Sequence, residues 1–593
     1  MMKNNRRIFM MTAFATIASL NINAAQKNQK PNVLLLLADD MGYGELGCYG
    51  HEYIKTPVLD KLAKKGIRFT DFHAGNAVSS ASRAVLMTGI GSGNNTIRGN
   101  SGFQMGEGRT RVALKETDIT MAEMLKSQGY QTAFVGKWHL ENPCDMTTWA
   151  YARGFDFAAQ EQWGDADCKN NFREGTEYIN GVQDSLIYDY TKWECKDAFR
   201  TQIALDYIDR ELDPEKPFFM FMSYRAPHAH EWDIRDNDLY KDRNWPEEER
   251  VHAAKITMLD KQIGRLLDKL DGMGLLENTI IIFSSDNGPQ NEAHDYGFHK
   301  SNGALRGYKR DMFEGGHRVP FIMYWKDNIE AGLVSDYLCG GQDVVPTIAN
   351  ATGAKLATNV TGQSLLPLLL EGEKMEQKNM YHEMWDSGFS RQSVRMGNWK
   401  AVRYGMNHAI RLYDLSTDLG ETKDLAKENP EVVKQITPLF EQMRTENKYF
   451  PRRDEDLRRR FLSVKSHKNE DIDFSLQFQP EGIHVYTTDV DKSNAVINVD
   501  YKLEAKNIGK EKNDKVNVVI RSIVFDETGN EIIRTSEGKT INKGDEEVIY
   551  SQKVELKNPI HWAPEKQTIY YVKSEIAFED KVIEEGITSI EIN

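Results

Sequence analysis

Residues 76–89, with the sequence NAVSSASRAVLMTG, bring three serines, an arginine and a terminal Thr-Gly together in one short stretch. A serine-rich turn that runs into a helix usually supplies only the helix cap. A serine can instead be a nucleophile, but its hydroxyl is a weak one and depends on neighbouring groups for activation. Which of the two applies depends on the other polar groups that the fold brings to this stretch.

Two carboxylates, Asp39 and Asp40, come directly after the apolar run at residues 32–38. Adjacent negative charges at the end of a buried strand are costly unless a positive charge lies beside them. A second apolar run is followed by Asp286 and Asn287, whose oxygens are ligands that calcium and magnesium prefer. The pattern favours a site for a divalent cation, whereas Asp39 and Asp40 taken alone could equally well cap the following loop.

Two lysines and two histidines stand in comparable places. Lys137 and His139 belong to the segment GKWH, His228 ends the segment RAPH, and Lys309 lies in the glycine-rich loop LRGYKRDMFEGG. Taken singly, a histidine at the end of a strand is most often structural, and a loop lysine is most often solvated. Gathered at one edge of a sheet with a metal ion, these four side chains would form a pocket for a tetrahedral anion.

The elements that would gather them are alternating strands and helices. Four stretches are continuously hydrophobic, as strands buried on both faces must be. They lie at residues 32–40, 131–139, 217–228 and 279–288. Amphipathic helices are predicted over 56–66, with Thr56 as N-cap and Gly66 as stop, and over 256–270. This alternation predicts an α/β domain with a mostly parallel sheet, whose strands carry their polar residues to one ligand-binding edge.

The segment around Ser79 resembles a family signature. In the sulfatase signature, a Cys or Ser followed by x-Pro/Ala-x-Arg and then Leu-x-Thr-Gly is oxidised to formylglycine, and SSASRAVLMTG is similar to it. Further stretches between residues 30 and 430 resemble blocks of that family in the family's order. They are ADDMGYGELGCYG, GKWHL, PFFMFMSYRAPH, IIIFSSDNG, YKRDMFEGGHRVPF and LYDLSTDLGETKDLA. The chain thus resembles the type I, formylglycine-dependent sulfatases of the alkaline phosphatase superfamily, which implies an alkaline-phosphatase-like domain with a mostly parallel central sheet.

The resemblance implies a nucleophile and a metal. Ser79 would be converted to formylglycine, one of whose hydroxyls in the hydrated form attacks sulfur, and Arg83 would orient it. One Ca²⁺ ion would assist the attack. Its ligands would be Asp39, Asp40, Ser79, Asp286 and Asn287.

The resemblance also assigns the lysines and histidines. Lys137 and Lys309 would hold the sulfate oxygens. His228, with Lys309, would protonate or stabilise the leaving alkoxide, which is a poor leaving group in a sugar sulfate. His139 would then take the proton of the second hydroxyl, so that sulfate leaves and the aldehyde is restored.

Two positions depart from the commoner form of the signature. Ser replaces Cys at position 79, and Ala replaces Pro at position 81. The serine form is associated with an anaerobic sulfatase-maturating enzyme that uses radical chemistry, whereas the oxygen-dependent enzyme needs Cys. We therefore expect an anaerobic bacterial host that supplies this maturating enzyme as a partner.

The first 25 residues predict export. Basic residues precede an apolar run from Ile8 to Leu20, and small residues follow at Ala24 and Ala25, as in a secretory signal peptide that is too short for a lasting membrane span. The mature protein is expected to be soluble and periplasmic, with no membrane span. Removal of residues 1–25, which carry three basic and no acidic side chains, changes the net charge from −14 to −17. Nucleic acid is therefore excluded as a partner.

The cysteines are five in number and widely spaced, with no CxxC pair. This pattern predicts neither a disulfide framework nor a cysteine zinc site.

The remainder of the chain differs in kind. Shorter strands and a helix near residues 430–446 predict a small α+β subdomain, and a polar linker near 463–472 precedes strands with period-two alternation that predict a β-sandwich. This tail resembles the immunoglobulin-like sandwich of glycoside hydrolase family 2, and a structural role is favoured over glycan binding. The predicted division is signal peptide 1–25, catalytic domain 26–374, α+β subdomain 375–465 and sandwich 470–593.

The leading hypothesis is a secreted carbohydrate sulfatase that hydrolyses O-sulfate esters of glycan sugars, with galactose or N-acetylgalactosamine sulfate as the preferred candidates. One alternative is a phosphatase or phosphodiesterase of the same superfamily that uses unmodified Ser79; a zinc phosphatase would need histidine ligands, and the oxygen-only metal set argues against it. The other is a glycan-binding protein with an inactive sulfatase fold. The predicted sugar contacts are Arg98, Trp163, His230 and Trp232.

Overall fold

The structure is a computed structural model of the chain. It describes residues 30–104, 108–162, 176–181, 184–187, 189, 192–229, 237–386, 389–405, 409–450, 465–466, 475–491, 493–506, 515–526, 531–542, 544–545, 547–560, 570–590 and 592. The predicted signal peptide and most of the predicted linker lie outside these residues.

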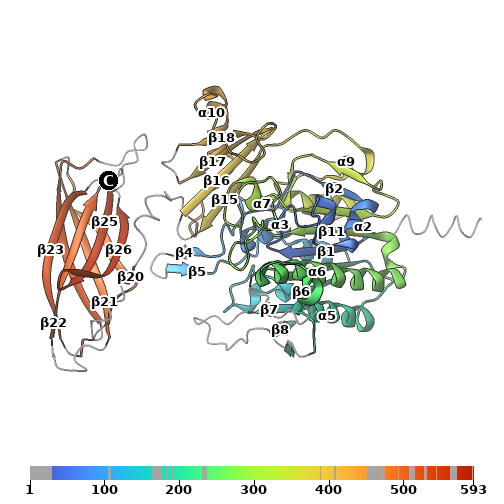
Figure 1. Cartoon of the computed structure of the whole chain (residues 1–593), viewed down its shortest axis with the longest axis horizontal. Coiled ribbons are helices and arrows are strands. Elements are labelled where there is room, and N and C mark those ends of the chain that lie inside the picture. Colours follow the sequence, from blue (N-terminus) through green and yellow to red (C-terminus); the bar gives the residue numbers. More distant parts are fainter. Residues whose placement is uncertain are drawn as a thin grey trace, which may run out of the picture.

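A ten-stranded sheet forms the centre of the larger part of the molecule (Figure 1). The strand order is β13-β2-β12-β11-β1-β10-β6-β7-β8-β9. The bounds, in chain order, are β1 Asn32–Asp39, β2 Ile67–Phe69, β6 Gln131–Lys137, β7 Phe157–Gln162, β8 Thr176–Ile179, β9 Asp184–Ile187, β10 Phe218–Pro227, β11 Thr279–Ser285, β12 Phe321–Trp325 and β13 Leu333–Ser335. Pairing is parallel from β11 through β1, β10 and β6 to β7, and antiparallel pairs flank this centre. The four predicted strands are confirmed, and they are neighbours in the sheet.

Both faces of the central strands are buried. Leu35 and Leu37 of β1 pack into one core with helices α3 (Ser79–Thr88), α4 (Met121–Lys126) and α8 (Val344–Thr352). Leu34 and Leu36 point to the opposite core, which contains α2 (Pro57–Lys65), α5 (Lys196–Arg210) and α6 (Glu247–Gly272). The domain therefore has three layers, and this arrangement explains why the central strands contain few polar residues before their carboxyl ends.

The predicted helix at residues 56–66 is α2, and Thr56 is its N-cap residue. The Thr56 hydroxyl does not cap the helix; it accepts a hydrogen bond from the Gly47 N–H at 2.9 Å and lies 3.1 Å from Asp60 Oδ1. Its role is therefore to connect the preceding loop to the helix.

A smaller antiparallel sheet follows the central domain. Its four strands, in spatial order, are β15 (Met380–Asp386), β16 (Phe389–Met396), β17 (Trp399–Tyr404) and β18 (Arg411–Asp414). The predicted helix near 430–446 is two short helices, α10 (Pro430–Ile436) and α11 (Leu439–Gln442), whose Ile436 and Phe440 pack against this sheet. The predicted α+β architecture is therefore present.

The C-terminal strands form two facing sheets, one of five strands in the order β19-β26-β25-β22-β23 and one of three in the order β20-β21-β24. Their bounds are β19 Lys465–Ser466, β20 Ser475–Thr488, β21 Asn494–Lys506, β22 Lys515–Phe525, β23 Glu531–Asn542, β24 Glu547–Lys557, β25 Tyr570–Phe578 and β26 Lys581–Ile590. Their inner residues make a separate core, which includes Ile497, Val499 and Val572. Figure 1 shows this sandwich to one side of the rest of the molecule. Among the described residues, no helix is long and apolar enough to cross a membrane.

Candidate active site

The predicted metal ligands come together at the carboxyl ends of β1 and β11. The Asp40 N–H donates to Asp286 Oδ1 at 3.1 Å, and the Asp286 N–H donates to the Ala38 carbonyl at 3.1 Å. Asp39, Asp40, Asp286 and Asn287 are all at most 1% exposed. Strands β1 and β11 are adjacent and parallel. They thus bring Asp39 and Asp40 into one buried cluster with Asp286 and Asn287, which follow them by about 250 residues in sequence.

Ser79 is the first residue of α3, and the N-cap residue is Val78, which makes no side-chain cap. The Ser79 hydroxyl is therefore not the N-cap of this helix. It donates to Asp286 Oδ2 and lies 2.9 Å from Lys137 Nζ and 3.2 Å from Arg83 Nε. The structure places Ser79, Arg83 and Lys137 together, and it removes the interpretation of Ser79 as a simple helix cap.

Each buried carboxylate is paired with a cation. Lys137 Nζ lies 2.6 Å from Asp39 Oδ2, and Lys309 Nζ lies 2.8 Å from Asp40 Oδ2. Burial opposes the ionisation of Asp39, but the positive charge of Lys137 and its neighbours holds the pKa of Asp39 well below its usual range. Burial lowers the pKa of Lys137 to about 8, against the attraction of Asp39. These ion pairs are buried, and electrostatic interactions are stronger in a buried site of low dielectric than in water.

The oxygens fit a hard divalent cation. Asp39 Oδ1 and Asn287 Oδ1 are buried and have no hydrogen-bond partner in the described part of the chain. Buried acceptors without a donor are costly, and such oxygens are typical ligands of Ca²⁺ or Mg²⁺. One ligand atom each of Asp39, Asp40 and His228 also lies within 4.8 Å of the other two. The residues present can therefore hold a metal ion.

His228 lies beside this cluster. Its Nε2 is 3.5 Å from Lys309 Nζ and 3.6 Å from Asp40 Oδ2. Burial lowers the pKa of His228 well below its usual range. Burial also acts to lower the pKa of Lys309, but the negative charge of Asp40 and Asp39 raises it above its usual value. Of the two groups assigned to the leaving oxygen, Lys309 is therefore the one that carries a proton at neutral pH.

His139 lies on the other side of the pocket. Its Nε2 is 2.6 Å from Arg111 Nη1, and its Nδ1 is buried without a hydrogen-bond partner in the described residues. Burial, followed by the positive charge of Arg111, lowers the pKa of His139 well below its usual range. Because Arg111 can only donate, Nε2 of the neutral ring accepts its hydrogen bond and Nδ1 carries the hydrogen, so His139 must release Arg111 before Nε2 can accept a proton as the predicted base.

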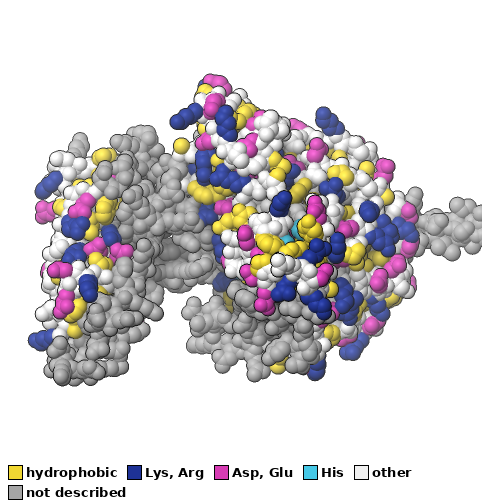
Figure 2. Space-filling model, viewed as in Figure 1, with side chains coloured by type: hydrophobic (Ala, Val, Ile, Leu, Met, Phe, Trp, Pro, Cys, Tyr) yellow, Lys and Arg dark blue, Asp and Glu magenta, His cyan; other side chains and the backbone are white. Residues whose placement is uncertain are grey.

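A pocket of about 220 Å³ lies beside Ser79 and the buried aspartates, which are not among its lining residues. Lys137, His139, His228 and Lys309 line it. Sequence reasoning missed several other lining residues. They are Asn100, Arg111, Glu141, Pro143, Glu161, Gln162, Arg225, Glu292 and Arg310. Arg225 and Arg310 lie inside the stretches SYRAPH and YKRDMFEGG, so proximity to the predicted site residues could have identified them. On the face seen in Figure 2, basic and acidic side chains are intermixed, and the net negative charge is not concentrated there.

The predicted sugar contacts are not assembled in the described pocket. Arg98 is 1% exposed, and its Nη1 lies 3.2 Å from Glu383 Oε1. Its guanidinium therefore forms an ion pair in the protein interior. Arg98 therefore has a structural role in place of the predicted one. Trp163, His230 and Trp232 lie outside the described residues.

One cysteine also differs from the prediction. Cys144 is disulfide-bonded, while Cys48 and Cys339 are free thiols. Cys144 follows Pro143, which lines the pocket. The sequence pattern contains no signal for this bond because the cysteines are few and far apart.

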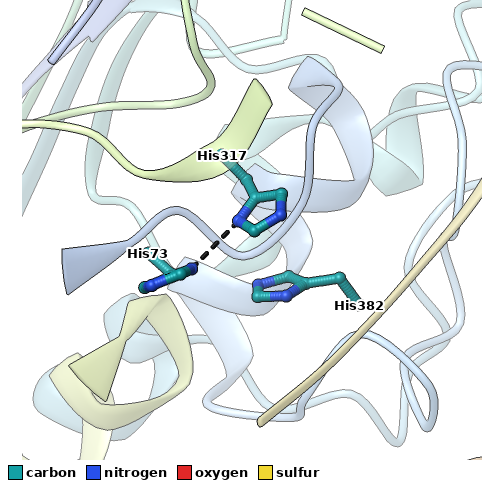
Figure 3. Close-up of side chains that lie close together, drawn as sticks. All are labelled: His73, His317 and His382. Carbon is teal, nitrogen blue, oxygen red and sulfur yellow. Dashed lines mark hydrogen bonds between the residues drawn. The ribbon is translucent and has the colours of Figure 1, made fainter. Parts of the chain in front are cut away.

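Three histidines that the sequence did not indicate form a cluster (Figure 3), and none of them lines the pocket. His73 ends β3 (Phe72–His73), His317 ends α7 (Glu314–His317), and His382 lies in β15. All three are at most 1% exposed, and His317 and His382 are stacked at a centroid distance of 4.2 Å. The cluster joins the central domain to the smaller sheet.

Hydrogen bonds within the protein hold most of the polar atoms of this histidine cluster. The Asp71 carboxylate can only accept, so His73 Nε2 carries a hydrogen. In neutral rings this leaves His317 Nε2 to accept from Lys400 Nζ, 3.3 Å away, and not to donate to the Met312 carbonyl at the same distance. His317 Nδ1–H then donates to His73 Nδ1 at 3.0 Å, and His73 Nε2–H donates to Asp71 Oδ1 at 2.9 Å. This ordered chain indicates a structural role.

The comparison with known families decides the identity. A family model described as "Sulfatase" matches residues 31–354, which is more than half of the chain and contains every predicted catalytic and metal-binding residue. The chain belongs to the sulfatase family. Two further models, "N-sulphoglucosamine sulphohydrolase, C-terminal" and "Glycosyl hydrolases family 2", match residues 307–448 and 481–590 of this sulfatase.

Relatives agree with this assignment. The sulfatase is 31% identical over 396 residues to an arylsulfatase from Hemicentrotus pulcherrimus, covering 63% of this chain and 67% of the relative. It is 29% identical over 429 residues to an N-acetylgalactosamine-6-sulfatase from Mus musculus, covering 68% and 77%. The crystal structure of Ps i-CgsB in complex with k-i-k-neocarrahexaose is similar with a TM-score of 0.63 and 25% identity, covering 72% of this chain and 96% of that chain. The sulfatase is a sulfuric ester hydrolase, and the predicted alkaline-phosphatase-like fold with an appended all-β domain is confirmed.

Proposed function

We propose that this sulfatase hydrolyses O-sulfate esters of glycan sugars and that residue 79 supplies the nucleophile. The observation that carries the proposal is the placement of the Ser79 hydroxyl against Asp286 and 2.9 Å from Lys137 Nζ, at the first turn of a buried helix. A helix N-terminus and a cationic side chain both favour negative charge at this point.

The substrate anion would be held by cations. Lys137 and Lys309 present ammonium groups to the pocket, and Arg83 reaches Ser79 from the next turn of the helix. The sulfate group carries one negative charge in the ester and gains charge on the leaving oxygen as the bond to the sugar breaks. Cations fixed before the reaction stabilise this developing charge without reorganisation.

Residues on two sides of the pocket would carry out the proton transfers. Lys309, with His228 3.5 Å away, would protonate the leaving alkoxide. His139, held neutral by its surroundings, would accept a proton from the group at position 79 during release of sulfate; it lines the same pocket as Lys137, which lies 2.9 Å from Ser79 Oγ. Arg111 orients the His139 ring through its Nε2.

Two groups complete the site. Asp39, Asp40, Asp286 and Asn287, with residue 79, would hold one Ca²⁺ ion, which supplies Lewis-acid assistance at the sulfur centre. Formylglycine formed from Ser79 supplies a geminal diol, a chemistry that a plain serine hydroxyl lacks. The unpartnered oxygens of Asp39 and Asn287 support the metal assignment.

The sugar is proposed from the relatives. One of them is an N-acetylgalactosamine-6-sulfatase, and one similar structure holds a neocarrahexaose. We infer a galactose or N-acetylgalactosamine sulfate as substrate. In Glu141, Oε2 is buried in the pocket wall without a hydrogen-bond partner in the described residues, and it is a candidate acceptor for a sugar hydroxyl.

We further propose that the protein is made with a signal peptide at residues 1–25, is matured at Ser79 by an anaerobic sulfatase-maturating enzyme and acts in the periplasm. The catalytic domain is assigned to 26–374, the α+β subdomain to 375–465 and the sandwich to 470–593. The separate hydrophobic cores of the last two support this division.

The test is a peptide mass spectrum covering Ser79 of protein made with the anaerobic maturating enzyme, combined with sulfate release from a panel of sugar sulfates. Loss of two hydrogens at residue 79 together with sulfate release supports the proposal. Full turnover by unmodified protein would contradict the formylglycine route and favour the serine phosphatase alternative, which phosphate esters in the same panel would reveal.

A further inference from the structure

A second cluster of histidines and carboxylates lies outside the substrate pocket. It forms where the loop after β1, helix α6 and the loop after β11 meet. One ligand atom each of Glu45, His252 and His294 lies within 4.8 Å of the other two. His252 Nε2 contacts Glu45 Oε1 at 2.5 Å, and Glu249 Oε2 lies 3.5 Å from His294 Nδ1. None of these four residues lines the substrate pocket.

His294 is the unusual member of the cluster. Its side chain is 1% exposed, yet neither ring nitrogen has a hydrogen-bond partner within the described residues. Glu249 Oε2 also makes no hydrogen bond of good geometry in that part of the chain, although it lies 3.5 Å from His294 Nδ1 and 3.3 Å from His299 Nε2. Buried polar atoms without hydrogen bonds destabilise a folded protein, so three of them in one place need an explanation. Atoms of this kind are what a bound ion would use.

The two carboxylates of the cluster are buried among histidines. Glu45 and Glu249 are at most 2% exposed, and the ion pairs found for them among the described residues are all with histidines. His252 and His294 are stacked face to face, with centroids 3.5 Å apart and planes at 15°. Two imidazolium cations would repel each other at this distance, so the rings do not both carry charge. A third ring, His299, lies 3.3 Å from Glu249 Oε2, so among the described residues only histidines, and no lysine or arginine, form ion pairs with the two carboxylates.

The histidine cluster of Figure 3 provides the contrast. There, a lysine, two histidines and an aspartate form an ordered hydrogen-bond chain, and cationic side chains surround the acidic ones. That cluster leaves one ring nitrogen, His382 Nδ1, without a hydrogen-bond partner in the described residues, whereas the cluster around His294 leaves both nitrogens of one ring and a carboxylate oxygen without one.

We propose that Glu45, Glu249, His252 and His294 form a second metal site, which takes one Zn²⁺ ion or a similar first-row divalent metal. Imidazole and carboxylate together suit such metals, whereas calcium prefers oxygen ligands alone. Coordination by both rings requires His294 to turn out of the stack, and its ring makes no hydrogen bond in the described structure that would oppose the turn.

The site would fix the segments that carry the active site. Glu45 follows Asp40 by five residues, and His294 follows Asn287 by seven. On α6, one turn after His252, Lys255 Nζ donates to the carbonyl of His228 at 3.1 Å. An ion bound here would therefore join three segments, each attached to a residue of the active site, without contacting substrate.

The first experiment measures metal content. The full-length mature protein, purified without chelator, should contain about one zinc per chain in addition to the alkaline-earth ion of the active site. The double variant His252→Ala/His294→Ala should lose at least nine-tenths of that zinc. The variant His484→Ala, at an exposed histidine of β20, should retain it. Equal zinc in the double variant and wild type would overturn the proposal.

A second measurement does not depend on folding of the double variant. Wild-type protein stripped with EDTA is titrated with Co²⁺, whose visible absorption reports nitrogen and oxygen ligation. The same titration uses Asp40→Asn, in which the active-site ligand set is broken, and Glu249→Gln, in which the proposed site is weakened. One equivalent of Co²⁺ should bind to Asp40→Asn as to wild type, and at least tenfold more weakly to Glu249→Gln. Absence of Co²⁺ binding in Asp40→Asn would overturn the second site.

Discussion

Lys137 Nζ lies 2.9 Å from Ser79 Oγ. The two residues come from different layers of the domain, since Lys137 ends a central strand and Ser79 begins a helix that packs on the sheet. Their contact places a cation beside the position where the nucleophile is proposed to form. The predictions below follow from this site and from the structure that supports it.

The variant Ser79→Ala should lose sulfate release by at least about 10⁴-fold, because no other hydroxyl replaces the nucleophile. The matched control is Ser82→Ala, a buried serine in the same helix that lines no part of the pocket. Initial rates on one sugar sulfate, with circular dichroism to check folding, measure the difference. More than a tenth of wild-type activity in Ser79→Ala would argue against a nucleophile at this position.

Lys309→Ala should lower kcat/KM by about 10²–10³-fold on a sugar sulfate, because Lys309 is the protonated group beside His228. An aryl sulfate has a better leaving group, and its hydrolysis should fall at least tenfold less. Lys64→Ala, at an exposed position of α2, serves as the control. Equal losses on both substrates would assign Lys309 to sulfate binding alone.

Arg98→Met should destabilise the protein by about 3–5 kcal/mol, since it leaves the buried Glu383 without one of its partners. Arg444 Nε remains 2.6 Å from Glu383 Oε2, so the lower end of this range is expected. The KM of the folded fraction should stay within about twofold of the wild-type value, because Arg98 does not line the pocket. Urea unfolding and steady-state kinetics test this together. Arg310→Met, in the pocket wall, should show the reverse: a changed KM and little loss of stability.

Glu421 should make stability depend on pH. Burial raises the pKa of Glu421 to about 7 from the ordinary value of 4.5, despite the opposing charge of Lys400. The folded state therefore favours the protonated form, and this contribution is fully present below pH 4.5 and is lost as the pH rises through 7. Relative to Glu421→Gln, which stays neutral, wild type should lose up to about 3 kcal/mol over this range. Urea unfolding of both proteins at pH 4.5, 6 and 7.5 measures it, and a constant difference would refute the assignment.

The sequence was sufficient for the strands and for the centre of the site. Runs such as 32–40 are hydrophobic without interruption, and few structures other than a strand buried on both faces accommodate them. Because the carboxyl ends of parallel strands share one edge, the sequence pattern alone predicts that Asp39 and Asp286 lie close together. The resemblance to sulfatases then assigned these positions their roles.

The remaining features depend on contacts between distant residues. The partner of Arg98 is Glu383, 285 positions away, and nothing in the local sequence distinguishes an arginine with a buried partner from one that faces substrate. The Thr56 hydroxyl accepts the Gly47 N–H from the preceding loop, although its local pattern is that of a helix cap. His73, His317 and His382 come from three separate elements and have no common motif. Pairings of this kind are set by tertiary packing, which a single sequence does not display.

Under the proposed export, the disulfide at Cys144 and the modified residue 79 would form in different compartments. Such bonds persist in oxidising surroundings and are removed in a reducing cytoplasm. The conversion of Ser79 would belong to the cytoplasm, before export, when the chain beside Pro143 is not yet cross-linked. The pocket wall would acquire its covalent link only after the nucleophile position has been modified and the chain exported. Protein retained in a reducing cytoplasm would thus be an incomplete version of the enzyme, even if its residue 79 were fully converted.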